Sequence, residues 1–149
     1  MHNTQHHLLL ADDDMDDCLL FREALEELPL VATLITVNNG VELMQMLFKK
    51  IGQLPDVLFL DLNMPRKNGF ECLSEIKENE KLRLLPVVIF STSFESEAVN
   101  LLYQKGAQYY IRKPGEFSKL KKVIAHVLNL ISITNKEQPT KDNFVLNDA

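Results

Sequence analysis

The most constraining feature of this sequence is a short apolar run that ends in an acid. Residues 57–60 are Val-Leu-Phe-Leu, and Asp61 follows directly, before a loop that contains Pro65 and Gly69. A run this short and this apolar is typical of a strand buried on both faces of a parallel sheet. Acids are also common where a chain simply turns, so Asp61 alone would not indicate a site. If the strand is buried, however, Asp61 lies at the carboxyl end of the sheet, where ligands bind in open α/β folds.

Patterns of short strands alternate with helical patterns along most of the chain. Between the expected strands, apolar residues recur at three- and four-residue spacing. We expect strands at 7–11, 33–37, 57–60, 87–90 and 108–112, and helices at 15–28, 40–51, 70–78, 95–105 and 116–131. Ser93 is expected to cap the fourth helix. This alternation predicts an α/β fold with a single doubly wound, five-stranded parallel sheet, and a flavodoxin-like strand order would be 2-1-3-4-5.

The expected domain spans residues 7–131, between two segments with little apolar pattern. With 149 residues, the chain is long enough for one domain with one sizeable core. Residues 1–6 are expected to be a flexible N-terminus. Residues 132–149 are expected to be a flexible C-terminal tail, because they are mostly polar and include a proline. The apolar residues 144–146 could anchor that tail, and the sequence leaves open whether it docks.

The composition argues against two classes of partner. A net charge of −5 and a pI near 5.4 disfavour nucleic-acid binding through a basic face. No apolar stretch is long enough to span a bilayer, and the first residues lack the pattern of a secretory signal. We therefore expect a cytoplasmic protein that binds neither nucleic acid nor membrane.

Acidic and polar residues follow four of the expected strands. Asp12 and Asp13 come after the first strand, Asp61 after the third, Ser91 after the fourth and Lys113 after the fifth. In a flavodoxin-like order the first and third strands are neighbours, so the three carboxylates meet at one edge of the sheet. A hard cation such as Mg²⁺, which prefers oxygen ligands, would compensate their repulsion. Asp61 could then attack phosphorus as a nucleophile, while Lys113 and the Ser91 hydroxyl stabilise the phosphoryl oxygens.

The same residues resemble the receiver domain of two-component response regulators. The resemblance covers residues 7–131 and rests on Asp12-Asp13, on Asp61 followed by Met64-Pro65 and Gly69, on Ser91 after an apolar strand, and on Lys113-Pro114. It implies that Asp61 is a phosphoacceptor supplied by a histidine kinase or a histidine phosphotransfer protein. It also implies a signalling switch rather than an enzyme, one that catalyses only its own phosphorylation and dephosphorylation.

The resemblance further implies roles for individual residues. The implied Mg²⁺ ligands are the side chains of Asp12, Asp13 and Asp61 and the backbone carbonyl of Asn63. Ser91 would be the hydroxyl of the conformational switch, Tyr110 the switch aromatic and Lys113 the lysine that senses the phosphate. Tyr110 could equally be a half-buried strand residue without a role in signalling.

Three features depart from the usual pattern of the family. Thr92 is bulkier than the small residue that usually follows the switch hydroxyl, which would narrow the access of a phosphodonor. Gly115 stands where many members have Phe. The acidic run is longer than the implied metal site needs, and we expect Asp14, Asp16 and Asp17 to form a solvated helix start that the helix dipole favours.

Two other functions that use a related fold are less well supported by the sequence. Phosphatases and phosphotransferases of the haloacid-dehalogenase type also form an aspartyl phosphate, but they carry a second Asp two residues after the nucleophile, where this chain has Asn63. A flavin- or nucleotide-binding module would need a phosphate-binding loop after the first strand. Asp12 and Asp13 occupy that position and would repel phosphate.

The sequence also leads to an expectation about the output of the switch. We find no second region large enough for an effector domain and expect a stand-alone receiver that signals to an unidentified protein partner or to a second copy of itself. Phosphorylation is expected to move Ser91 and to let Tyr110 rotate inward. This would change a face formed by the fourth helix, fifth strand and fifth helix, which includes Lys105, Lys119 and Lys122.

Overall fold

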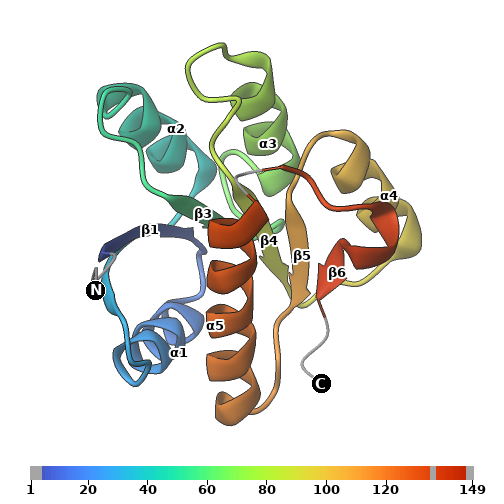
Figure 1. The fold of residues 1–149 in the computed structure, drawn as a ribbon. Helices are drawn as coiled ribbons and strands as arrows, with labels where there is room; N and C mark the ends of the chain where they lie inside the picture. Colours follow the sequence, from blue (N-terminus) through green and yellow to red (C-terminus); the bar gives the residue numbers. More distant parts are fainter. Residues whose placement is uncertain (1–4, 135–136, 147–149) are drawn as a thin grey trace.

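Strands and helices alternate along the chain in the computed structural model, which describes residues 5–134 and 137–146 (Figure 1). The strands are β1 (Gln5–Ala11), β2 (Val31–Val37), β3 (Val57–Leu60), β4 (Val87–Ser91), β5 (Tyr109–Arg112) and β6 (Val145–Leu146). The helices are α1 (Met15–Glu26), α2 (Gly40–Lys49), α3 (Gly69–Glu78), α4 (Ser96–Gln104), α5 (Phe117–Thr134) and the short 3₁₀ helix η1 (Lys141–Asn143). Over the described residues, none of these helices is long and apolar enough to cross a membrane.

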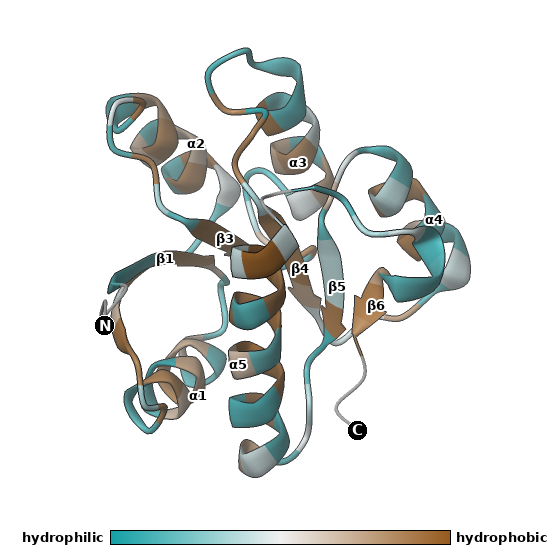
Figure 2. Cartoon of the chain, viewed as in Figure 1, coloured by the Kyte–Doolittle hydropathy of each residue, from teal (hydrophilic) through white to brown (hydrophobic). Residues whose placement is uncertain are grey.

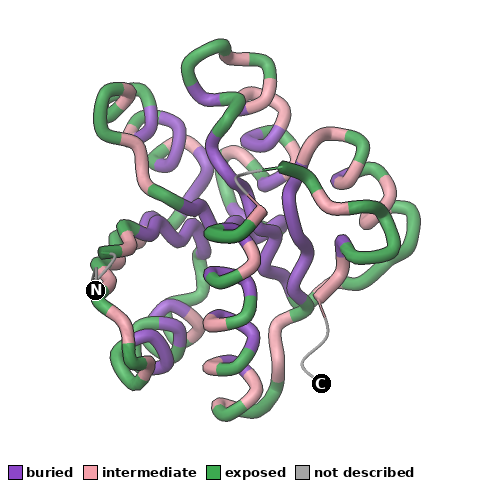
Figure 3. The backbone as a smooth tube through the Cα atoms, viewed as in Figure 1, coloured by how far each residue is buried: buried purple, intermediate pink, exposed green. Residues whose placement is uncertain are grey.

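All strands pair in parallel in one sheet of order β2-β1-β3-β4-β5-β6. The predicted α/β class and the order of the first five strands are therefore confirmed, and β6 is a short addition at one edge. Every residue of β3 and β4 is buried (Figure 3). Both strands lie in the middle of the sheet with helices on each face, which is why their sequences are continuously apolar rather than alternating.

The helices cover the two faces unequally. Helices α1 and α5 pack on one face, and α2, α3 and α4 pack on the other. Alternate residues of β3 point to opposite faces. Phe59 lies edge-on to Phe21 of α1, with ring centroids 4.8 Å apart, whereas Leu58 and Leu60 pack with residues of α2 and α3. Figure 2 shows the apolar residues of β3 and β4 enclosed between these two layers.

Three helix starts have a side-chain cap, and that of α4 does not. Asp14, Asn39 and Asn68 each accept a hydrogen bond from a backbone N–H of the first turn that follows them. The prediction that Ser93 caps α4 is wrong, because the helix begins at Ser96 and its N-cap residue, Glu95, makes no capping hydrogen bond. Residues 92–95 instead form a loop between β4 and α4, beside the edge of the sheet where the acids lie.

The structure differs from the expected boundaries at both ends of the domain. β1 starts at Gln5, so residues 5 and 6 belong to the sheet, and residues 1–4 lie outside the described part. α5 continues to Thr134. Residues 137–146, the C-terminal segment, then lie along α4 and β5 and end in β6, which pairs with β5 (Figure 1). Within the segment expected to be a flexible tail, residues 132–134 therefore continue α5, and residues 137–146 lie against α4 and β5.

A buried aromatic side chain and several hydrogen bonds hold this segment in place. Phe144 is fully buried, with its ring centroid 5.1 Å from that of Tyr103 on α4 and 6.4 Å from that of Tyr110 on β5. The Tyr110 amide donates to the Phe144 carbonyl at 3.0 Å, and the Tyr103 hydroxyl donates to the Pro139 carbonyl at 2.7 Å. The segment is polar overall, which is why composition indicated flexibility, but its few apolar residues bury enough surface to hold it.

Candidate functional site

The predicted carboxylates meet at the carboxyl ends of β1 and β3. Ala11 pairs with Leu60, so Asp12 and Asp61 each follow the last paired residue of two neighbouring strands. One carboxylate oxygen from each of Asp12, Asp13 and Asp61 lies within 4.8 Å of the other two. Asp12 and Asp61 are buried, whereas Asp13 is exposed at the rim. We call these three residues the acidic edge.

The backbone around Asp61 is held closely. Its amide donates to the Ala11 carbonyl at 3.0 Å, and its Oδ1 accepts from the Leu62 amide at 2.8 Å. The loop that follows returns to the strand end, where the Gly69 amide donates to the Leu62 carbonyl at 2.9 Å. A Cβ at Gly69 would lie 2.3 Å from the Asp61 carbonyl oxygen, so only glycine permits this approach. The pairing with β1 and the loop that follows therefore fix the Asp61 backbone together.

Burial and a neighbouring acid change the protonation of Asp61. Removal from water raises the pKa of its carboxyl to about 6, Lys113 acts to lower it, and Asp12 raises it further. Without a bound cation, part of the Asp61 population therefore carries a proton near pH 6. A cation placed among the carboxylates would favour the charged form, which is the form that can act as a nucleophile.

Lys113 reaches the acidic edge from the end of β5. Its Nζ lies 2.8 Å from Asp12 Oδ2, 2.7 Å from Asp17 Oδ2 and 3.6 Å from Asp61 Oδ2. Burial acts to lower the pKa of Lys113, but hydrogen bonds to Asp12 and Asp17 outweigh that effect and raise it above its usual value. The ammonium is therefore charged throughout the physiological range. Its backbone amide also donates to the Ser91 carbonyl at 2.9 Å, which ties the ends of β4 and β5 together.

Ser91 and Tyr110 are connected through the loop between β4 and α4. Ser91 is fully buried at the end of β4, and its Oγ accepts from the Ser93 amide at 3.2 Å. The Tyr110 hydroxyl donates to the Ser93 carbonyl in a short hydrogen bond. Tyr110 is itself fully buried, between Phe94 and Phe144. The sequence led us to expect Tyr110 to rotate inward on phosphorylation, and in this structure the side chain is already buried.

Comparison with known proteins identifies the family. The family model of the response regulator receiver domain matches residues 8–125. The chain belongs to this family. It is 32% identical to response regulator Rcp1 from Synechocystis sp. over 122 residues, which are 78% of this chain and 82% of that protein. Receiver domains are signalling modules of two-component systems, and the fold and motifs described above are those of such a module.

Solved structures agree with this assignment. The phosphorylated cyanobacterial phytochrome response regulator RcpA superimposes with a TM-score of 0.78 and 29% identity, covering 92% of this receiver and all of that chain (100%). The Mn²⁺-bound form of Rcp1 superimposes with a TM-score of 0.73 and 29% identity, covering 91% of this receiver and 97% of that chain.

The residues of the acidic edge suit a hard divalent cation. Asp12 Oδ2 is fully buried, and the Lys113 ammonium lies 2.8 Å from it. One ammonium does not neutralise three neighbouring carboxylates, and burying the uncompensated charge is costly unless a cation binds there. The cluster offers only oxygen atoms, which Mg²⁺ and Mn²⁺ prefer over nitrogen or sulphur. Asp13 and Asn63 are exposed, so part of the coordination shell faces water.

The contact between Asp17 and Lys113 was not predicted from the sequence. Asp14, Asp16 and Asp17 were all expected to form a solvated helix start, but only Asp14 and Asp16 match that description. Asp14 caps α1, Asp16 is exposed, and Asp17 turns inward to Lys113. No local signal marked it, because the contact joins the first turn of α1 to the end of β5, 96 residues away.

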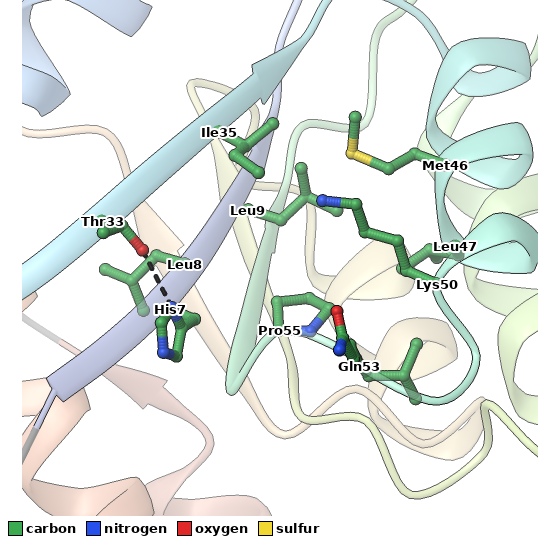
Figure 4. Close-up of a pocket in the computed structure, with 11 residues that line it drawn as sticks. His7, Leu8, Leu9, Thr33, Ile35, Met46, Leu47, Lys50, Gln53 and Pro55 are labelled. Carbon is green, nitrogen blue, oxygen red and sulfur yellow. Dashed lines mark hydrogen bonds between the residues drawn. The ribbon is translucent and has the colours of Figure 1, made fainter.

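A separate cavity of about 380 Å³ lies toward the amino ends of β1 and β2 (Figure 4). It is lined mainly by apolar residues of β1 and α2, with the His7 ring hydrogen-bonded to the Thr33 hydroxyl at 3.0 Å and the Lys50 side chain crossing it. It contains none of the predicted site residues. The acids lie at the opposite ends of these parallel strands, so the cavity has no part in the site.

Proposed function

We propose that this receiver accepts a phosphoryl group on Asp61 from a histidine kinase or a histidine phosphotransfer protein. The observation that carries the proposal is the acidic edge, with Asp61 fixed by the strand before it and the loop after it. Asp61 attacks the phosphorus of the phosphohistidine, the P–N bond breaks as the O–P bond forms, and the leaving imidazole takes up a proton. We place this reaction in the cytoplasm, where histidine kinases have their phosphodonor domains.

Mg²⁺ is the proposed cofactor, held by the side chains of Asp12, Asp13 and Asp61 and by the Asn63 carbonyl. Bound there, it would neutralise charge on the phosphoryl oxygens and keep Asp61 ionised. The Lys113 ammonium is proposed to neutralise charge on the same phosphoryl oxygens. Its Nζ is 3.6 Å from Asp61 Oδ2 before any phosphoryl group is present. The buried Ser91 hydroxyl is the donor proposed for a third contact to those oxygens.

The signal is proposed to leave the site through the loop between β4 and α4. Ser91 Oγ bonds the Ser93 amide, and the Ser93 carbonyl accepts from Tyr110, so a movement of Ser91 reaches Tyr110 through two hydrogen bonds. Because Tyr110 is already buried under Phe144, a change at Tyr110 acts on the C-terminal segment rather than on open space. This modifies the output face expected from the sequence.

The proposed output face therefore consists of α4, α5 and the C-terminal segment, which covers the edge of β5. Lys105 contributes less to it than expected, because its Nζ donates to Ser74 Oγ of α3 at 2.6 Å. The downstream partner is a protein or a second copy of this chain. A partner with different affinities for the two states shifts the equilibrium between them, and phosphorylation then changes partner affinity by the same factor.

Mass spectrometry of the intact protein tests the proposed acceptor. Incubation with acetyl phosphate and Mg²⁺ is expected to add one phosphoryl group, and omission of Mg²⁺ is expected to prevent the addition. Asp61→Asn should remain unmodified, whereas Asp16→Asn, an exposed acid of α1, should be modified like the parent. A phosphoryl group retained by Asp61→Asn would overturn the assignment.

A further inference from the structure

Lys113 is held by an acid that lies outside the proposed metal ligands. Its two short contacts are with Asp17 Oδ2 at 2.7 Å and Asp12 Oδ2 at 2.8 Å, while Asp61 Oδ2 is farther away at 3.6 Å. The lysine that should assist chemistry at Asp61 is therefore bound more closely to two other carboxylates. Of these two, Asp12 is a proposed metal ligand and Asp17 is not.

The position of Asp17 is well defined. It lies in the first turn of α1, where its backbone amide and that of Asp16 donate to the capping carboxylate of Asp14 at 3.1 and 2.9 Å. The Asp17 side chain is 29% exposed and the Lys113 side chain only 10% exposed. Water screens this ion pair less than it screens a pair on the open surface. The helix start thus fixes one end of the contact, and the end of β5 fixes the other.

The arrangement creates a competition for one ammonium group. Lys113 has three N–H donors, two of which are directed to Asp17 and Asp12. A cation bound at the acidic edge would satisfy Asp12 and weaken its hold on Lys113. Asp17 would then be the acceptor that competes with a phosphoryl group on Asp61 for the same ammonium.

We propose that Asp17 is a positioning residue that restrains Lys113 and so opposes formation of the phosphorylated state. This inference rests on the proposed function of Asp61. Removing the carboxylate of Asp17 frees one donor of Lys113, which then moves the remaining distance to the phosphoryl oxygens. Asp17 thereby tunes how strongly the site holds a phosphoryl group without contacting that group itself.

The Asp17 charge could also act without Lys113, by direct repulsion of a phosphoryl group. The Asp16→Asn variant separates repulsion of the phosphoryl group from restraint of Lys113. Asp16 carries the same charge in the same helical turn but makes no ion pair with Lys113 in the described structure. A second separation comes from Lys113→Ala, which removes the group through which Asp17 is proposed to act. The effect of Asp17 should disappear in that background.

The test is a titration with fluoroberyllate, a mimic of the phosphoryl group, in the presence of Mg²⁺. Affinity is measured calorimetrically for the parent, Asp17→Asn and Asp16→Asn, with a thermal melt of each variant to show that it is folded. Asp17→Asn is expected to bind roughly two- to fivefold more tightly than the parent, the range expected for a partly screened ion pair. Asp16→Asn should bind as the parent does. Asp17→Ser serves as the second variant if the amide perturbs the helix start.

Each outcome of the titration has one meaning. Unchanged or weaker binding by both Asp17 variants would overturn the inference, as would an equal gain in Asp16→Asn. An undiminished gain in the Lys113→Ala background would show that Asp17 acts as a bare charge, and would also overturn it. A parent protein that binds no fluoroberyllate would instead contradict the proposed function of Asp61.

Discussion

The acidic edge and the C-terminal segment lie on different parts of the same sheet and differ in what holds them. At the acidic edge, two buried carboxylates and a third at the rim are brought together by strands that are fixed elsewhere in the fold. The C-terminal segment is held by its own contacts, chiefly the buried ring of Phe144 and hydrogen bonds to α4 and β5. Repulsion among the carboxylates of the acidic edge costs free energy, and a bound cation can relieve that cost. The C-terminal segment needs no ligand, because its own contacts stabilise it.

This difference suggests how the two regions cooperate. A cation and a phosphoryl group change the charge balance at the acidic edge, where the fold tolerates a cost. The C-terminal segment depends on modest burial, so a small change at Tyr110 can alter its docking. Ser91 and Ser93 lie between them. The four predictions that follow test the contrast, beginning with the largest expected effect.

Phe144→Ala should lower the free energy of unfolding by about 3 kcal/mol, because a fully buried aromatic side chain is removed. Urea denaturation measures this loss. Hydrogen exchange of the Tyr110 amide, which donates to the Phe144 carbonyl, should also become faster. Phe48→Ala is the matched control, since Phe48 is 46% exposed on α2 and should cost far less. Equal losses in the two variants would mean that the C-terminal segment is not held by Phe144.

Asp61→Asn should raise the free energy of unfolding by about 2 kcal/mol at pH 7.5 without divalent cations. The pKa of Asp61 is raised from 3.8 to about 6, so the folded protein binds this proton more tightly than the unfolded chain does. Protonation therefore stabilises the fold, and stability is lost as the pH rises from about 4 through 6. The Asn amide carries no charge at any pH. The extra free energy of unfolding in Asp61→Asn should therefore be present at pH 7.5 and vanish below pH 4. Urea denaturation at several pH values measures it, and a gain that persists at pH 3.5 would contradict this origin.

Asp13→Asn should raise stability without a cation by less than about 1 kcal/mol, because Asp13 is exposed and water screens its repulsion of the buried acids. The same variant should lose most of the increase in melting temperature that Mg²⁺ gives the parent. Thermal melts with and without Mg²⁺ measure both effects, with Asp16→Asn as the control. A variant that melts below the parent in the absence of cations would show that the acidic edge carries no cost from Asp13.

Ser91→Ala should change the free energy of unfolding least of the four variants. It should, however, uncouple the C-terminal segment from phosphorylation at the acidic edge. Asp61 is expected to remain phosphorylatable, while the amide chemical-shift changes that fluoroberyllate causes in α4, β5 and the C-terminal segment should fall to less than about half of the parent values. The Ser91 hydroxyl accepts from the Ser93 amide and is the proposed link. Ser93→Ala keeps both backbone contacts and should respond as the parent does. Undiminished shifts in Ser91→Ala would mean that the signal takes another route.

Much of the fold and most of the candidate site could be predicted from sequence because their signals are local. The apolar runs of β3 and β4, followed by Asp61 and Ser91, indicated buried parallel strands ending at one edge, and the structure confirms that arrangement. Strand order then brought Asp12 next to Asp61, as expected from the topology of the fold. These inferences succeeded because a buried strand and the residue after it are specified by adjacent amino acids.

Only the tertiary structure decided three further points, each a contact between residues far apart in the chain. Lys113 could have paired with any nearby acid, and packing of α1 against the sheet selected Asp17, 96 residues away. The mostly polar C-terminal segment docks because Tyr103 and Tyr110 form a site for Phe144, which no local pattern encodes. Tyr110 is buried by contacts with Phe94 and Phe144, which precede and follow it in the chain by 16 and 34 residues. Local sequence determines which helices and strands form and which polar residues follow them. Pairing among distant side chains depends on geometry that exists only in the folded chain.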